Sequence, residues 1–314
     1  MLRCCFMGTP AFSVPSLRKI IQSGHEISLV VSKPDKPIGR NRKISPTPIK
    51  QEALKHSLNI EQPEKVSDPL FINKLENLNL DIGLVVSYGA ILPLSVLKIP
   101  RYGFINLHPS LLPKYRGPSP LQAALAAGDT VSGITIMRVN EKMDAGPILS
   151  QSEEIILPAD NLEIFYDRMA EKGADRLCEV LEVFDRTGTC VSVPQKEEDA
   201  VYCPKIDDNF SRIDWKWPAE KIVNRAKSLA PRPGLRTSWQ GRFFKILKAS
   251  VFSKVSSGHK SGTIVAHHKN EALEVATVDG SLLVQELQIE GSRKMTAQDF
   301  VNGKGSNSVG TSLV

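Results

Sequence analysis

Three side chains of different chemistry stand where a fold could bring them together: an amide, an imidazole and a carboxylate. Asn106 and His108 lie two residues apart at the end of an apolar run, and residues two apart on a strand point to the same face. Asp144 lies in a loop marked by Gly and Pro, after the alternating run of residues 133–139. A carboxylate beside an imidazole favours the imidazolium and fixes its tautomer, so such a histidine can move a proton at neutral pH.

This set of groups suits acyl transfer to an amine. The amide of Asn106 can donate to a developing oxyanion. No Ser, Cys or Lys is marked as a nucleophile by an elbow motif, so direct attack by a substrate amine fits better than a covalent enzyme intermediate. The alternative is that His108 caps a loop and Asp144 caps a turn. Three convergent groups beside loops containing Pro and Gly favour a catalytic centre.

The elements that must position these residues alternate between strand and helix through residues 1–187. Apolar, often β-branched runs alternate with segments of helical spacing, which predicts an α/β fold with a doubly wound, mostly parallel sheet. The expected strands are residues 3–7, 26–32, 81–87, 103–107, 131–139 and 148–157, and the expected helices are residues 12–23, 49–57, 68–78, 119–127 and 161–187.

This alternation is lost after residue 187, and a different pattern follows. We expect a catalytic domain over residues 1–189, a charged, proline-containing linker over 190–208, and a second domain over 209–314. The second domain shows a helix near 218–229 and short strands at 236–240, 242–249, 262–266, 272–277 and 281–288. Short strands with close turns predict a small β-barrel, and the OB-like kind is a common nucleic-acid platform.

Composition and charge narrow the class of protein. None of the apolar stretches approaches the ~20 residues of a membrane span, and five cysteines without a C-x-x-C pair predict reduced, cytosolic thiols and no zinc site. Residues 209–314 hold 16 Lys and Arg against 8 Asp and Glu, whereas residues 1–208 hold 24 against 26. A basic C-terminal third indicates a polyanion partner, although a solvated surface would have the same charge.

Two further segments have features of binding sites. Residues 33–50 form a long insertion with six Lys or Arg, one Asp and four Pro. Such a basic loop could bind phosphate groups, or it could be a solvated surface loop. Tyr88 to Leu92 follow an apolar strand, where backbone groups could bind a flat heterocycle or form a buried turn. By contrast, the single glycine of Gly8-Thr-Pro10 is only a weak match to a phosphate loop.

These motifs resemble those of the 10-formyltetrahydrofolate-dependent formyltransferases, over nearly the whole chain. The segments that carry the resemblance are Asn106-x-His108 with Ser110-Leu-Leu-Pro113, Met143-Asp-x-Gly146-x-Ile148, the basic insertion, and Arg212-Ile-Asp-Trp215. The last two resemble the branch of the family that formylates initiator methionyl-tRNA for translation initiation. Two departures are Pro109, where many members have Gly, and Lys114-Tyr-Arg116, where many have Arg-Trp-Arg.

The resemblance implies roles for individual residues. Asn106, His108 and Asp144 would form the catalytic centre, and no metal is expected. The folate co-substrate would lie against Ser110, Leu111, Leu112, Pro113, Tyr88, Gly89, Ile91 and Leu92, and the tRNA would contact Arg40, Arg42 and Lys43. The barrel would add contacts to the tRNA backbone. We expect a cytoplasmic enzyme that acts as a monomer.

Three other functions use parts of the same sequence. A glycinamide ribonucleotide formyltransferase would need only the first domain and would leave residues 209–314 idle. A formyltransferase for amino sugar nucleotides can share the Arg212 to Trp215 feature, but the basic insertion disfavours it. A non-catalytic tRNA-binding protein should have lost Asn106, His108 and Asp144, and this chain keeps all three.

Overall fold

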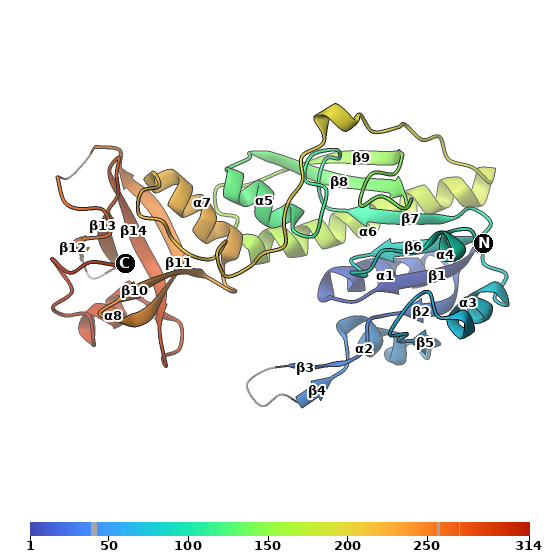
Figure 1. Cartoon of the computed structure of the whole chain (residues 1–314), viewed down its shortest axis with the longest axis horizontal. Helices are drawn as coiled ribbons and strands as arrows, with labels where there is room; N and C mark the ends of the chain where they lie inside the picture. The colour runs from blue at the N-terminus through green and yellow to red at the C-terminus, as the bar shows by residue number, and fades with distance from the viewer. Residues whose placement is uncertain (39–42, 256–257, 270) are drawn as a thin grey trace. The chain divides into compact units, whose positions relative to one another are not determined.

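The computed structural model describes residues 1–38, 43–255, 258–269 and 271–314. The chain forms two compact units (Figure 1). The N-terminal unit consists of residues 1–120, 131–155 and 166–204, and the C-terminal unit consists of residues 121–130, 156–165 and 205–314. None of the helices in the described part of the chain combines the length and the apolar character that crossing a membrane requires.

The N-terminal unit contains a seven-stranded sheet in the order β5-β2-β1-β6-β7-β8-β9. The strands are β1 (Arg3–Gly8), β2 (Glu26–Val31), β5 (Ile60–Glu61), β6 (Ile82–Val86), β7 (Phe104–His108), β8 (Val131–Arg138) and β9 (Ile148–Ile155). All neighbouring pairs are parallel except those made by β8, which runs antiparallel to β7 and β9. The predicted mostly parallel sheet is confirmed.

Helices lie on both faces of this sheet. Phe71 and Val96, from α3 (Pro69–Glu76) and α4 (Leu94–Leu97), belong to the same buried cluster as Met7 and Phe104. On the opposite face of β7, Leu107 lies against α6 (Leu162–Thr187), where a Cβ on Gly173 would come within 2.7 Å of its side chain. The helices are α1 (Val14–Gln22), α2 (Pro48–Lys55), α3 (Pro69–Glu76), α4 (Leu94–Leu97), α5 (Pro120–Ala127) and α6 (Leu162–Thr187), with short 3₁₀ turns at Ala11–Ser13 and Glu197–Asp199.

The basic insertion contains a short antiparallel ladder that periodicity did not predict. Its strands are β3 (Lys36–Ile38) and β4 (Lys43–Ser45). The base of the insertion is fixed by Lys50, whose Nζ donates to Asp35 and to Gln62 over 2.6 Å each. Gln62 in turn donates to Asp35 over 2.7 Å. The hydrogen bonds that Asp35 accepts hold its pKa below the usual value, with the bond from Gln62 as the largest cause and the bond from Lys50 next.

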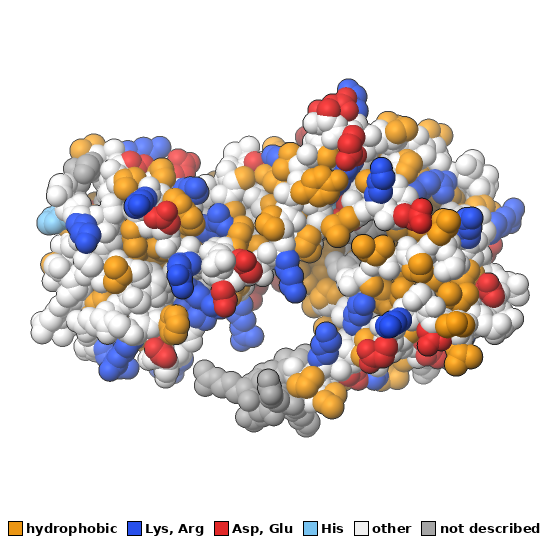
Figure 2. Space-filling view, in the orientation of Figure 1, with side chains coloured by type: hydrophobic (Ala, Val, Ile, Leu, Met, Phe, Trp, Pro, Cys, Tyr) orange, Lys and Arg blue, Asp and Glu red, His pale blue; other side chains and the backbone are white. Residues whose placement is uncertain are grey.

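The C-terminal unit contains an antiparallel sheet in the order β10-β11-β14-β13-β12, with β15 beside β14. Its elements are α7 (Ala219–Leu229), β10 (Leu235–Trp239), β11 (Arg242–Ser253), β12 (Ile264–His268), β13 (Ala272–Ala276), β14 (Ser281–Ile289), β15 (Met295–Thr296) and α8 (Ala297–Asn302). The face of this unit that Figure 2 shows carries many Lys and Arg side chains. Strands β10 to β14 match the predicted series, whereas β15 and α8 were not predicted.

Residues 311–314 connect the two outer strands of this sheet. Ser238, on β10, exchanges both backbone hydrogen bonds with Val314, over 2.7 and 2.9 Å. On the other side, the amide of Ile264 on β12 donates to the carbonyl of Thr311 over 2.9 Å. The sheet is thereby closed into the predicted small barrel, because its two outer strands share one bridging segment.

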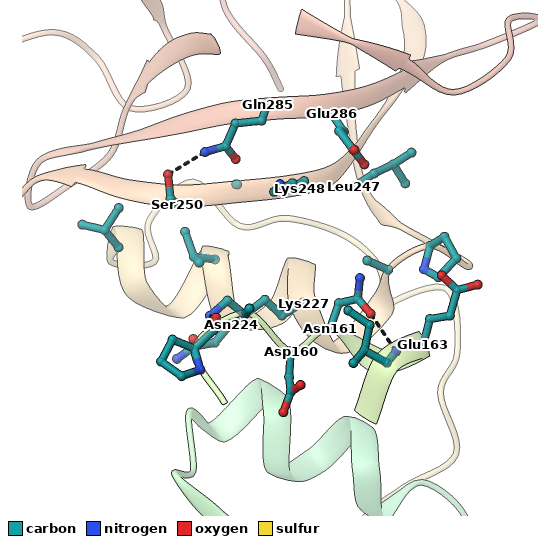
Figure 3. A pocket seen from close by; sticks show the side chains of 18 of the residues that line it. Asp160, Asn161, Glu163, Asn224, Lys227, Leu247, Lys248, Ser250, Gln285 and Glu286 are labelled. Atoms are coloured by element: carbon teal, nitrogen blue, oxygen red, sulfur yellow. Dashed lines mark hydrogen bonds between the residues drawn. The ribbon is translucent and has the colours of Figure 1, made fainter. Parts of the chain in front are cut away.

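A cavity of about 540 Å³ lies within the C-terminal unit, between the start of α6, helix α7 and strands β11 and β14 (Figure 3). Several of its polar side chains are bound by neighbours in the same unit. Lys227 donates to the carbonyl of Pro158 over 2.8 Å, and Gln285 donates to Ser250 over 2.8 Å. These two lining side chains are therefore held by partners within the same unit.

Candidate active site

Asn106 and His108 lie on β7, on the face opposite the Leu107 side chain. Asn106 pairs with Val85 of β6 and Met137 of β8, so its strand is held from both sides. Asn106 is partly exposed, whereas His108 is 5% exposed. The structure thus places the amide and the imidazole on the same face at the end of β7, as the two-residue spacing predicted.

The imidazole of His108 is held through one nitrogen. Its Nε2 lies 2.9 Å from the backbone carbonyl oxygen of Tyr115. Because a carbonyl can only accept a hydrogen bond, Nε2 carries a proton in this contact. Nδ1 lies 3.7 Å from Oδ2 of Asp144. The nitrogen that can gain or lose a proton is therefore Nδ1, on the side of the carboxylate.

This geometry corrects one expectation about Asp144. The tautomer of His108 is set by the carbonyl of Tyr115. The 3.7 Å separation from Asp144 is too long for a hydrogen bond, and it becomes an ion pair only when His108 is protonated. The Asp144 carboxylate is itself held, because the backbone amide of Gly117 donates to Oδ2 over 2.8 Å. Asp144 is therefore placed where it would stabilise an imidazolium by charge.

The loop that carries Asp144 depends on a close backbone approach. Asp144 has φ of 50°, in the left-handed region, which costs most L-residues about 1–2 kcal/mol. Two residues later, a Cβ on Gly146 would come within 1.7 Å of the carbonyl oxygen of Arg138, at the end of β8. Only glycine allows the chain to pass there, so Gly146 fixes the loop against the sheet.

The Ser110 to Pro113 segment is bound tightly to the antiparallel part of the sheet. Thr135 on β8 donates to the carbonyl of Ser110 over 2.6 Å and accepts from the amide of Leu112 over 3.2 Å. Leu111 lies over β8, where a Cβ on Gly133 would come within 2.4 Å of its side chain. Leu111 and Pro113 are partly exposed, while Ser110 and Leu112 are buried.

The segment from Tyr88 to Leu92 follows β6, the parallel neighbour of β7. It therefore lies at the end of the sheet where β7 also finishes. Gly89 and Ile91 are exposed, whereas Tyr88 and Leu92 are buried. Burial raises the pKa of Tyr88 to about 12. Of the residues expected to line a folate pocket, the accessible ones are Gly89, Ile91, Leu111 and Pro113; the buried ones hold the two segments in place.

The turn after β1 connects to this segment and is not a free phosphate loop. The hydroxyl of Thr9 donates to the carbonyl of Tyr88 over 3.0 Å and accepts from the amide of Lys33 over 3.3 Å. A Cβ on Gly8 would come within 2.8 Å of Ser13. The glycine is therefore explained by a tight strand-to-helix turn.

The expected tRNA contacts fall on the insertion. Arg40 and Arg42 lie outside the described residues, and so does the side chain of Lys43, whose backbone belongs to β4. The described arms of the insertion, β3 and β4, bring Lys36 and Ser45 opposite one another. The backbone of these two described arms can therefore be placed, and the contacts of Arg40, Arg42 and Lys43 stay a prediction.

Sequence reasoning missed Gln195 as a contributor to this site and noted Arg116 only as part of a departure from the family motif. Arg116 is fully buried, and its guanidinium donates to Glu197 over 2.8 Å and to the hydroxyl of Tyr202 over 3.1 Å. Burial lowers the pKa of Arg116, but its bonds with Glu197 and Tyr202 outweigh burial, and the net pKa is raised. Gln195 lies in a segment without periodicity, so no pattern pointed to it.

The arrangement can therefore bind an anionic oxygen and move a proton. Asn106 offers an amide donor, and His108 offers one exchangeable nitrogen beside the Asp144 carboxylate. In the described ranges, no group of three or more His, Cys, Asp or Glu side chains is arranged to hold a metal ion. The side chains in place suit general acid–base chemistry on an acyl group.

The sequence and the fold match those of known formyl transferases. The formyl transferase family model matches residues 2–181, and the model of its C-terminal domain matches residues 205–305. The methionyl-tRNA formyltransferase of Enterococcus faecalis is 39% identical over 308 residues, covering 98% of this chain and 97% of that protein. The methionyl-tRNA formyltransferase of Methylococcus capsulatus is 40% identical over 304 residues, covering 96% of each.

A solved structure supports the fold. The N-formyltransferase from Helicobacter canadensis, in complex with folinic acid and dTDP-3-aminofucose, superposes with a TM-score of 0.68 at 18% identity, covering 90% of this chain and 99% of that chain. At this identity the likeness concerns the fold alone, and the sequence relatives decide the branch. The chain therefore belongs to the formyl transferase family, among the methionyl-tRNA formyltransferases with which it shares nearly its whole length.

Proposed function

We propose that this chain transfers a formyl group from 10-formyltetrahydrofolate to the α-amino group of initiator methionyl-tRNA, for use in translation initiation. The observation that carries the proposal is the approach of His108 Nδ1 to Asp144 Oδ2, 3.7 Å apart, beside Asn106 on the same strand face. The named activity of relatives about 39% identical over nearly the full length supports the choice of substrates.

In this proposal the amine of the aminoacyl group attacks the formyl carbon directly. A new C–N bond forms to give a tetrahedral intermediate, and the C–N bond to the folate nitrogen breaks as that intermediate collapses. Asn106 donates to the oxyanion of that intermediate. His108 passes a proton from the incoming amine to the leaving nitrogen through Nδ1, since Nε2 is engaged by the carbonyl of Tyr115. Asp144 stabilises the imidazolium formed in between.

The folate co-substrate would lie at the end of the sheet where the parallel strands β6 and β7 finish. Gly89 and Ile91 from the first segment, and Leu111 and Pro113 from the second, offer exposed or partly exposed backbone and apolar surface. The buried neighbours Tyr88, Leu92, Ser110 and Leu112 would keep these segments in position. A flat heterocycle fits such a surface because backbone groups can bind its edge.

The tRNA would be bound by charge outside the catalytic centre. The basic insertion, with Arg40, Arg42 and Lys43, and the C-terminal unit with its excess of Lys and Arg are the two surfaces suited to a polyanion. We take the active form to be one chain, because Asn106, His108 and Asp144 come from the same chain. Since its tRNA substrate is used in translation, we place the enzyme in the cytoplasm.

The test is formyl transfer from 10-formyltetrahydrofolate with three acceptors in parallel: initiator methionyl-tRNA, the same tRNA without its amino acid, and glycinamide ribonucleotide. Product with the charged tRNA alone supports the proposal. Product with glycinamide ribonucleotide instead would keep formyl transfer and reject the tRNA substrate. If none of the acceptors is formylated, the reaction itself is wrong.

A further inference from the structure

Gln195 connects two parts of the candidate active site through one amide group. Its Nε2 donates to the backbone carbonyl of Asp144 over 3.0 Å and to that of Gly146 over 2.7 Å. Its Oε1 accepts from Nε of Arg116 over 3.0 Å. Gln195 thus contacts the Asp144 loop through its donor and the buried arginine through its acceptor.

These contacts fix the orientation of the amide. An arginine can only donate and a backbone carbonyl can only accept, so the oxygen of Gln195 must face Arg116 and its nitrogen must face the loop. A flipped amide would place donor against donor and acceptor against acceptor. Arg116 is itself immobilised by Glu197 and Tyr202. The position of the Gln195 nitrogen is therefore set by a buried, bound guanidinium.

The Asp144 loop needs such a support. Residues 140–143 are exposed, and Asp144 holds a left-handed backbone conformation with φ of 50°. Such conformations persist when surrounding contacts enforce them. Gln195 binds the carbonyls of Asp144 and Gly146, and the amide of Gly117, next to Arg116, binds the carboxylate of Asp144. Gln195 therefore holds the main chain of Asp144, and the amide of Gly117 holds its side chain.

We propose that Gln195 is a positioning residue for formyl transfer, which holds the Asp144 loop so that the carboxylate stays beside Nδ1 of His108. This inference rests on the proposed function, because it assigns Asp144 a part in the reaction. Arg116 would act one step further away, by orienting the amide of Gln195. A misplacement of about 1 Å at a catalytic group can lower a rate on the order of 100-fold.

The competing explanation is that Gln195 only fastens its own segment, residues 190–204, to the rest of the N-terminal unit. Loss of the side chain would then lower stability but leave the turnover of the folded enzyme unchanged. The two explanations differ in whether the loss of turnover caused by a Gln195 substitution depends on Asp144. A double-mutant cycle with Asp144 measures that dependence, since residues that act through one another have non-additive effects.

The test uses the full chain with Gln195→Leu, alone and combined with Asp144→Asn, and measures kcat, KM for the charged tRNA and the pH–rate profile. We expect Gln195→Leu to lower kcat by about 10- to 100-fold, with KM nearly unchanged. Its pH–rate profile should shift in the same direction as that of Asp144→Asn. In the Asp144→Asn background, the same substitution should cause little further loss.

Controls keep the outcomes distinct. Glu198→Gln changes an exposed neighbour in the same segment and should keep wild-type kcat. If Gln195→Leu does not fold, Gln195→Glu replaces it, because the carboxylate still accepts from Arg116 but cannot donate to the loop. Unchanged kcat in a folded Gln195 variant, or an equal loss in both backgrounds, would overturn the proposal. Wild-type turnover in Asp144→Asn alone would instead reject the proposed role of Asp144.

Discussion

The backbone amide of Gly117 donates to the Oδ2 atom of Asp144 over 2.8 Å, across 27 residues of sequence. The same oxygen is the one that faces Nδ1 of His108. Gly117 has φ of 120°, and a Cβ there would come within 2.4 Å of the carbonyl oxygen of Cys203. The amide that binds Asp144 is therefore presented by a backbone conformation and a close approach that only glycine allows.

We expect Gly117→Ala to lower kcat by about 10-fold or more, because the added methyl group must displace the amide that holds Asp144. Affinity for tRNA should change little. Gly24→Ala is the matched control, since Gly24 also has a positive φ but nothing within 4 Å of an added Cβ. Steady-state kinetics of both variants check the prediction, which fails if the two keep the same kcat.

A second prediction concerns the basic insertion. Replacing Arg40, Arg42 and Lys43 by Ala should weaken binding of the charged tRNA, because fewer counterions would be released from its phosphates. The slope of log K against log salt concentration should flatten by about 2 to 3, or about 0.7 to 0.9 for each lost phosphate contact. Filter binding or fluorescence at several salt concentrations measures this slope, and an unchanged slope would exclude these residues as phosphate contacts.

A third prediction concerns stability in acid. Glu52 is buried, and Arg18 binds it through two hydrogen bonds of 2.6 and 2.9 Å. The bonds from Arg18 are the largest cause that lowers the pKa of Glu52 from 4.5 to about 2; burial opposes this shift, and Lys55 and His56 add to it. A lowered carboxyl pKa stabilises the fold above the unfolded-state value, and this stabilisation disappears as pH falls through the folded-state value. The effect should therefore be complete near neutral pH and vanish between about pH 4.5 and 2.

Urea unfolding of Glu52→Gln across this pH range checks the sign. Because the Arg18 side chain is about half exposed, we expect a loss of about 2 kcal/mol near neutral pH, less than the full pKa shift would imply. Glu179→Gln, from an exposed pair with Arg176, should change stability by under about 1 kcal/mol. A Glu52→Gln penalty that stays constant down to about pH 2 would contradict the assignment.

Local sequence patterns were enough to predict the elements whose burial is set by their own residues. The apolar, β-branched run before Ser87 became β6, and the run ending at His108 became β7, because buried parallel strands need continuous apolar residues. The two-residue spacing of Asn106 and His108 was enough to place both on one face. The turn residues around Asp144 correctly indicated a loop after β8.

Contacts between distant residues could not be predicted in this way. Gln195 lies in a charged segment without periodicity, and its importance depends on carbonyls about fifty residues away. The tautomer of His108 depends on the carbonyl of Tyr115, which any residue type could have supplied. The bonds from Val314 to Ser238 likewise join β10 to a segment that lacks an alternating pattern. Backbone partners leave no signature in the side-chain sequence.

The most direct test of the account is the rate of formyl transfer to initiator methionyl-tRNA by Asp144→Asn, measured in a single turnover with folding verified by urea unfolding. Asp167→Asn, an exposed carboxylate on α6, is the control. We predict a loss of about 100- to 10,000-fold for Asp144→Asn, with tRNA binding intact and the control at the wild-type rate. A folded Asp144→Asn enzyme that transfers formyl at nearly the wild-type rate would contradict the account.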